Sequence, residues 1–369
     1  MKSERETSWR PPGSVRSPRY QTRDAGSGAT SFGVSHRSVN DWPLLPWPRG
    51  PLSAFVVSAL QREPGTLGPT PHLAGVDVLR DDDFGLALYL CYEVHYRNLA
   101  EPFWRDDPQL LEFRRELEGI FVEHLHEAIR LATPTDSIGA TTALDELIRR
   151  SSENSLSVFL SESGTLEHFR ELCVHHSAYQ LRDADPLAFG MPRHADDTRA
   201  TAGSVESARS GSTDSPSNLF AATMVALGLD PSYGSYVENL PAVTLALVNL
   251  TSMFSLERKW RAALVGHLAV SDMTSSEPMY RYGQALARFG IGPEGRRFYD
   301  VKSNINARHT VIARERLVAG LIGAVPHLES DLLFGAAALL VLEENFEKHV
   351  LDAWWHGRTS LVPWRSVSW

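Results

Sequence analysis

The sequence is poor in cysteine and in long apolar runs. Its 369 residues include only two cysteines, Cys91 and Cys173. Both lie within apolar patterns of helical period, so we expect buried free thiols rather than a disulfide or a metal site. The longest apolar run, residues 241–250, is too short to cross a membrane, and the first residues lack the apolar centre of a secretory signal. These absences predict a cytoplasmic protein that makes no use of a membrane.

Basic residues are fewer than acidic ones, with 36 Lys or Arg against 45 Asp or Glu. The net charge is −9 at pH 7, which argues against nucleic acid as a partner because phosphate binding needs a basic surface. Residues 1–40 differ, with seven Lys or Arg against three Asp or Glu, a net of +4. This Arg-, Ser-, Pro- and Gly-rich segment has too few apolar residues to form a core. We therefore expect a disordered tail over residues 1–45, a single domain over 46–362 and a short tail over 363–369.

Alternating strand patterns and internal repeats are absent, and nearly every patterned segment has a helical period. The clearest case is residues 109–132, where Leu110, Phe113, Leu117 and Phe121 recur on one face. The sequence therefore predicts an all-α fold. Further helices are expected to open at 50–53, to follow the acidic run at 81–83, and to lie near 141–150, 164–182, 217–227, 236–254, 256–270, 279–289, 298–322 and 328–356.

Residues 195–217 interrupt the helical pattern because they contain almost no apolar side chains. This composition predicts an irregular or mobile loop. A loop of this length between two strongly patterned helices is uncommon inside a compact domain unless it serves the function.

Familiar catalytic motifs are missing, since there is no HExxH, no GxSxG and no glycine-rich phosphate loop. Glu93 interrupts an apolar helical segment, so its carboxylate must be paired, protonated or bound to a metal. Pairing with an arginine or tyrosine and a role in a functional site are both open. Lys302, Asn306 and His309 share one helical face at i, i+4 and i+7. Only histidine is a common metal ligand among them, so this spacing alone does not establish a metal site.

Several long stretches resemble one bacterial family. They are PWPRGPLS (46–53), LALYLCYEVHYR (86–97), HHSAYQLRDADP (175–186), residues 220–250, ALVGHLAVSDMTSS (263–276), FYD (298–300) and HVLDAWWHGRTSL (349–361). Over residues 48–362 the chain resembles the iron-containing redox enzymes of the haem-oxygenase-like diiron oxidase superfamily. The resemblance implies a haem-oxygenase-like multi-helix bundle of about seven core helices, with two irons held between helices by carboxylates and histidines. It also implies O2-dependent oxidation of a small molecule beside the iron.

The metal ligands of that family, carried over by position, fall on seven residues of this sequence. The family pattern has a glutamate at a helix end, then Glu-x6-Glu-x2-His on a middle helix, then His-x3-Asp-x2-His on a late helix. Side chains that can bind a metal stand at three of these positions, namely Asp183, Glu206 and His309. The other four positions are replaced by Thr213, Pro216, Lys302 and Asn306.

Three ligands are too few for two irons, which take about four to six protein ligands in carboxylate–histidine sites. The resemblance therefore implies iron as the family cofactor and a divergent member without a full diiron centre. Two alternatives stay open: a metal-free protein that binds a small molecule or a partner, and a mononuclear iron site on Asp183, Glu206 and His309. In the metal-free case we expect the Lys302 ammonium to pair with Asp183 or Glu206 and to replace the charge of the metal.

Overall fold

The chain folds into a bundle of helices in the computed structural model. The structure describes residues 45–63, 67–73, 77–96, 102–132, 140–150, 155–182, 215–312, 318, 322–323 and 325–363. Within these residues there are twelve α-helices and no β-strand, so the predicted all-α fold is confirmed. Across the same ranges, no helix combines the length and the apolar character that a membrane span needs. The tail predicted for 1–45 lies outside these residues except for Leu45, and residues 195–214 lie outside them as well.

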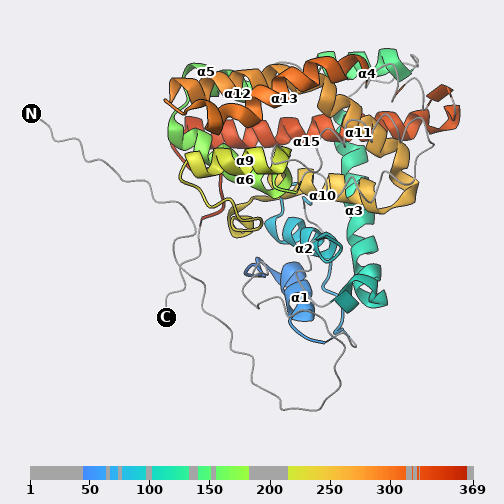
Figure 1. Cartoon of the computed structure of the whole chain (residues 1–369). Coiled ribbons are helices and arrows are strands. Elements are labelled where there is room, and N and C mark those ends of the chain that lie inside the picture. The colour runs from blue at the N-terminus through green and yellow to red at the C-terminus, as the bar shows by residue number, and fades with distance from the viewer. Residues whose placement is uncertain are drawn as a thin grey trace, which may run out of the picture.

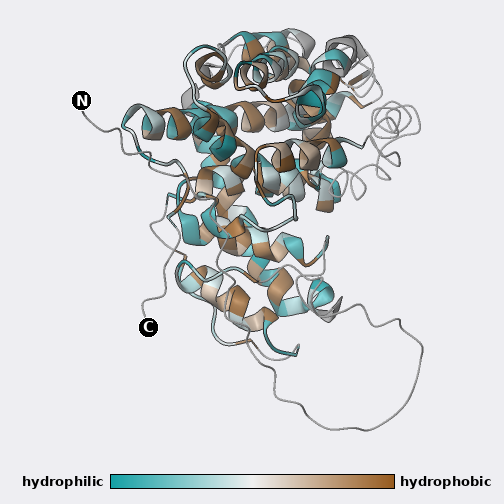
Figure 2. Cartoon of the chain, turned by 60° about the vertical axis from the view of Figure 1, so that its left-hand side comes forward, coloured by the Kyte–Doolittle hydropathy of each residue, from teal (hydrophilic) through white to brown (hydrophobic). Residues whose placement is uncertain are grey.

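The long helix α15 runs through the middle of the molecule (Figure 1). In that view α5, α12 and α13 lie above it, α6, α9 and α10 lie below it, and α1 and α2 form the bottom of the bundle. Figure 2 shows apolar and polar residues alternating around most helices, as expected for elements that are half buried. The helices are α1 (Pro51–Leu60), α2 (Asp82–Glu93), α3 (Pro108–Ala132), α4 (Ala140–Arg150), α5 (Ser155–Glu162), α6 (Leu166–Gln180), α9 (Pro216–Ala226), α10 (Ala242–Leu256), α11 (Arg261–Thr274), α12 (Ser276–Arg288), α13 (Pro293–Ile312) and α15 (Glu329–Trp355).

Prolines stand at three of the helix starts that differ from the predicted bounds. The helix expected from residue 236 begins at Ala242, because residues 237–239 form a 3-10 turn and Pro241 occupies the N-cap. The helix expected from residue 298 begins at Pro293, since proline is well suited to a first helical position. Helix α9 begins at Pro216, inside the stretch predicted to be irregular, because the Ser215 side chain caps its first turn. The short helix α5 was not predicted.

Three successive aspartates before and within the first turn of α2 cap three different helices. Asp81 accepts a hydrogen bond from the third residue of its own helix at 2.7 Å. Asp82 accepts one from the first backbone N–H of α10 at 2.6 Å. Asp83 accepts two from the second and third residues of α1 at 2.8 and 2.7 Å. The acidic run was predicted to begin one helix, and it also fixes the starts of two others.

Helices α11 and α15 cross so closely that only glycine fits at the contact. A Cβ on Gly266 would lie 1.9 Å from the carbonyl oxygen of Leu332, and one on Gly335 would lie 2.0 Å from that of Ala263. Both distances are far below van der Waals contact, so any side chain here would force the helices apart. Cys91 in α2 and Cys173 in α6 are both free and buried, as expected.

Candidate functional site

The inner faces of α6 and α13 meet at a polar contact. Lys302 on α13 is half-buried, and its Nζ donates a hydrogen bond to Oε1 of Gln180 at 3.0 Å. The same ammonium lies 5.2 Å from the centre of the Phe298 ring, within the range of a cation–π contact. The Lys302 side chain is therefore turned toward the C-terminal end of α6.

His176 lies one turn before Gln180 on α6 and is buried among aromatic rings. Its ring centre is 5.2 Å from that of Tyr179, 6.4 Å from Tyr282 and 6.2 Å from Phe346. Among the described residues no group forms a hydrogen bond with His176 Nδ1. Burial, with the positive charge of Lys302 added, lowers the pKa of His176 to about 3, so the imidazole is neutral at physiological pH.

Sequence reasoning missed His176 and Gln180, although a signal for them was present. His176, Gln180 and Asp183 have the spacing i, i+4 and i+7, the same as the spacing of Lys302, Asn306 and His309 on the facing helix. Two such polar faces on neighbouring helices indicate a polar interior between them. His176 is also adjacent to His175 in the sequence, and adjacent helical residues point to different faces.

The structure describes the surroundings of two of the seven predicted ligand positions. Lys302 bonds to Gln180, as above, and Pro216 is the first residue of α9. Asp183, Glu206 and Thr213 lie outside the described residues. Asn306 and His309 lie on α13, but their side chains are outside the described set.

These two positions do not fit a two-iron centre. Proline has no side-chain donor atom, and a protonated lysine repels a divalent cation. Within the described ranges, no three His, Cys, Asp or Glu side chains are grouped closely enough to hold a metal ion. Between α6 and α13 the structure thus describes an ammonium, an amide and a neutral imidazole, and also the Cys173 thiol 3.8 Å from the Tyr299 hydroxyl.

Glu93 forms a fully buried ion pair next to this interior. Its Oε1 accepts a hydrogen bond from Arg182 Nη1 at 2.5 Å, and its Oε2 accepts one from the Tyr233 hydroxyl at 2.8 Å. The side chains of Glu93 and Arg182 are 0% and 1% exposed. Although burial alone lowers the pKa of Arg182, its neighbours Tyr233 and Glu93 raise it above its ordinary value. Of the two readings left open for Glu93, pairing with an arginine and a tyrosine is the one observed.

This ion pair fixes the end of α6. Arg182 also donates to the Ser252 hydroxyl at 3.0 Å and lies over the Tyr96 ring at 5.0 Å, so it joins the end of α6 to α2 and α10. Asp183 follows Arg182 directly in the sequence. The Arg182 guanidinium therefore fixes the backbone directly before Asp183, the first of the family's metal-ligand positions.

The opposite face of α6 holds the C-terminal segment of the chain. Ser360 donates its hydroxyl hydrogen to Glu171 at 2.8 Å and accepts from His175 Nε2 at 2.9 Å. His175 Nδ1 then accepts from the Thr244 hydroxyl at 2.7 Å. Burial lowers the pKa of His175 well below its ordinary value, which keeps the ring neutral and this tautomer in place. His175 is thus a structural histidine.

Comparisons with known proteins agree with the resemblance described above. Residues 170–344, a little under half of the chain, match the family model described as iron-containing redox enzyme. The matched range includes most of α6, all of α9 to α13 and the first part of α15, and so contains both helices of the candidate site. No curated protein matches the chain significantly. The match assigns residues 170–344 to the iron-containing redox enzyme family.

Proposed function

We propose that this chain is a relative of the iron-containing redox enzymes that assembles no two-iron centre and acts on a small molecule as a metal-free protein. The observation that carries the proposal is the contact between Lys302 Nζ and Gln180 Oε1 at 3.0 Å. It supports an ammonium turned into the space between α6 and α13, where the family pattern has a metal ligand.

The positive charge of Lys302 is large enough to weaken iron binding at this position strongly. At an effective dielectric constant of about 20, an ammonium roughly 5 Å from a divalent iron is repelled by about 7 kcal/mol. Deprotonating an ordinary lysine at pH 7 instead costs roughly 4–5 kcal/mol. By either route the affinity for iron falls by about a thousandfold or more. We propose that Lys302 pairs with Asp183 or Glu206 and supplies the charge that iron supplies in the family.

Metal analysis of the purified protein tests this proposal. The chain is expressed with added iron, and the iron per chain is counted by mass spectrometry. We expect no stoichiometric iron together with a single sharp thermal transition. Two irons per chain would overturn the proposal. One iron per chain that is lost in His309→Ala would establish the mononuclear site on Asp183, Glu206 and His309 instead.

Two sets of variants test the ligand positions and the charge. Restoring Lys302→His and Asn306→Asp together is expected to give no two-iron site, because Thr213 and Pro216 still replace two ligands. Stoichiometric diiron in that double variant would show that these two positions are wrongly assigned. Lys302→Met should lower the melting temperature because it leaves carboxylates uncompensated. Lys259→Met, at an exposed lysine, is the matched control and should leave the melting temperature unchanged.

A further inference from the structure

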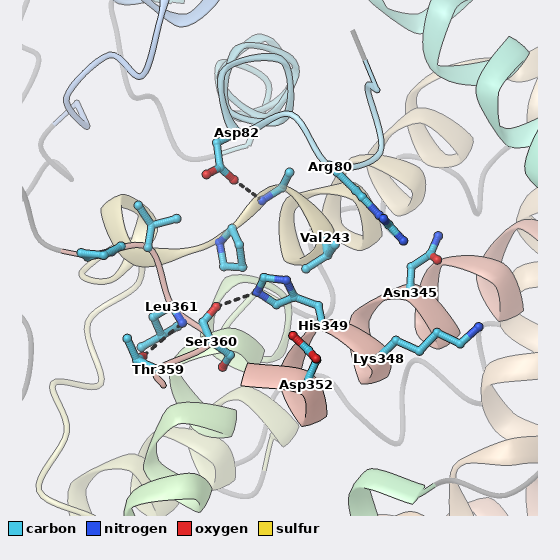
Figure 3. Close-up of a pocket in the computed structure, with 14 residues that line it drawn as sticks. Arg80, Asp82, Val243, Asn345, Lys348, His349, Asp352, Thr359, Ser360 and Leu361 are labelled. Atoms are coloured by element: carbon cyan, nitrogen blue, oxygen red, sulfur yellow. Dashed lines mark hydrogen bonds between the residues drawn. The ribbon is translucent and has the colours of Figure 1, made fainter. Parts of the chain in front are cut away.

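A cleft lies between the C-terminal segment and two helix ends, on the side of the molecule shown in Figure 3. Its walls are the residues around the start of α2, the first turn of α10, the last third of α15 and residues 359–363. Its volume is about 530 Å³, within the usual range for small-molecule sites. We call it the C-terminal cleft. None of its lining residues is among the candidate ligand positions on α6 and α13.

Arg80 supplies an uncompensated positive charge to this cleft. No described residue forms an ion pair or a side-chain hydrogen bond with its guanidinium. In Figure 3 the guanidinium points toward the side-chain amide of Asn345, which has no hydrogen-bond partner among the described residues either. The N–H donors of the Arg80 guanidinium and of the Asn345 amide therefore point into the same part of the cleft. A planar guanidinium beside an amide matches the geometry of a carboxylate.

The other charged groups of the cleft are already paired. Asp82 accepts from the first N–H of α10 and lies 3.8 Å from Arg49. Asp352 pairs with Arg358 at 3.0 Å. The ammonium of Lys348 forms an ion pair with Glu344 on its own helix. Among the described residues, Arg80 therefore gives the cleft its net positive charge. The positive end of the α10 dipole adds to this charge, because the first residues of that helix line the cleft.

The remaining walls are apolar and firmly held. Pro241, Val243 and Leu361 present hydrocarbon surface to the cleft. The adjoining segment is fixed because the backbone oxygen of Ser360 accepts from His349 Nε2 at 2.8 Å, and its hydroxyl is bound to α6 as described above. A preformed cleft of this kind binds a ligand without a large ordering cost.

We propose that the C-terminal cleft binds a small organic acid, with its carboxylate between Arg80 and Asn345 and its apolar part against Pro241, Val243 and Leu361. A cation and an amide that have no partner among the described residues, placed beside an apolar wall, select this class of ligand. A neutral compound of the same shape lacks the charge that Arg80 recognises, and acetate lacks the apolar surface. The proposal does not depend on the proposed function, because it concerns different residues.

Titration of the full chain with benzoate, benzamide and acetate tests the proposal, with affinity measured by ligand-observed NMR. We expect saturable benzoate binding in the millimolar range or tighter, and at least tenfold weaker binding of benzamide and of acetate. Arg80→Gln and Asn345→Asp should each weaken benzoate binding at least tenfold. Both positions are at least partly exposed, so the fold should tolerate these changes, and circular dichroism and thermal melting check this.

A matched control fixes the place of binding. Arg115→Gln makes the same change at an exposed arginine of α3 and should leave benzoate affinity unchanged. Benzoate that binds no better than benzamide, or equally well to wild type and Arg80→Gln, overturns the proposal. So does the absence of saturable binding.

Discussion

Replacing Arg182 by methionine should be among the most damaging single changes in the protein. The substitution keeps an unbranched side chain but removes the guanidinium that pairs with Glu93. The Glu93 carboxylate would keep the Tyr233 hydroxyl at 2.8 Å as a partner. Breaking one side of a buried ion pair costs about 3–5 kcal/mol. Protonating a carboxyl of ordinary pKa at pH 7 costs roughly 3–4 kcal/mol, so neutralisation offers no cheaper route at that pH.

The pH dependence of this loss distinguishes a buried charge from lost packing. Without its cation, a buried carboxylate binds a proton more tightly in the folded chain than in the unfolded chain. Between pH 7 and pH 5 the folded variant therefore holds more protons, and its stability relative to wild type rises as the pH falls. The cost of protonation decreases by about 2.7 kcal/mol over these two pH units. Most of the difference between variant and wild type should disappear by pH 5.

Urea unfolding at both pH values measures the effect. We expect Arg182→Met to lose about 3–4 kcal/mol at pH 7, and Arg182→Met combined with Glu93→Gln to lose less than the single variant, because no charge remains buried. Arg115→Met, at an exposed arginine, should be neutral. A loss below about 1 kcal/mol in Arg182→Met, or a loss that is the same at pH 5 and pH 7, would refute the reasoning.

Three further predictions follow from packing, burial and hydrogen bonding, each read out by thermal or urea unfolding. Gly335→Ala should destabilise by about 1–3 kcal/mol or more, whereas Gly119→Ala, with open space around its Cβ, should stabilise by up to about 1 kcal/mol; equal effects would contradict the close helix crossing. Burial lowers the pKa of His267 to about 4, so this residue should remove roughly 2 kcal/mol of stability between pH 7 and pH 5, since the unfolded chain binds the proton. His267→Gln should show a shallower pH dependence, and an unchanged slope would disprove the link. Ser360→Ala should cost about 1–3 kcal/mol because Glu171 and His175 lose a buried partner; a neutral result would mean that the C-terminal segment is held by its other contacts.

Much of the fold could be predicted because apolar residues recur with a helical period over long stretches. Helix α3 was placed to within a residue at its start, since Leu110, Phe113 and Leu117 fix its buried face. Helix α5 was missed because eight residues give too few turns to establish a period. The start of α10 was misplaced because a 3-10 turn and Pro241 precede it, and apolar content continues through both.

The candidate site was harder to derive because its contacts join distant parts of the chain. The sequence showed that Glu93 needs a partner, but the partner lies 89 residues away. It placed Lys302 on one face of a helix, but spacing cannot tell whether that face meets Gln180 or solvent. The side chains of Asp183, Glu206 and His309 stay predictions as metal ligands.

The three aspartates at the start of α2 also restrict how this chain can change in length. Successive residues at a helix start point about 100° apart, and here each direction meets the beginning of a different helix. Inserting or deleting one residue among Asp81, Asp82 and Asp83 would turn each carboxylate toward the wrong neighbour, although the composition would hardly change. Substitutions at this junction each remove one cap, whereas a single-residue insertion or deletion disconnects three helices at once. We therefore expect the junction to tolerate changes of residue far better than changes of length.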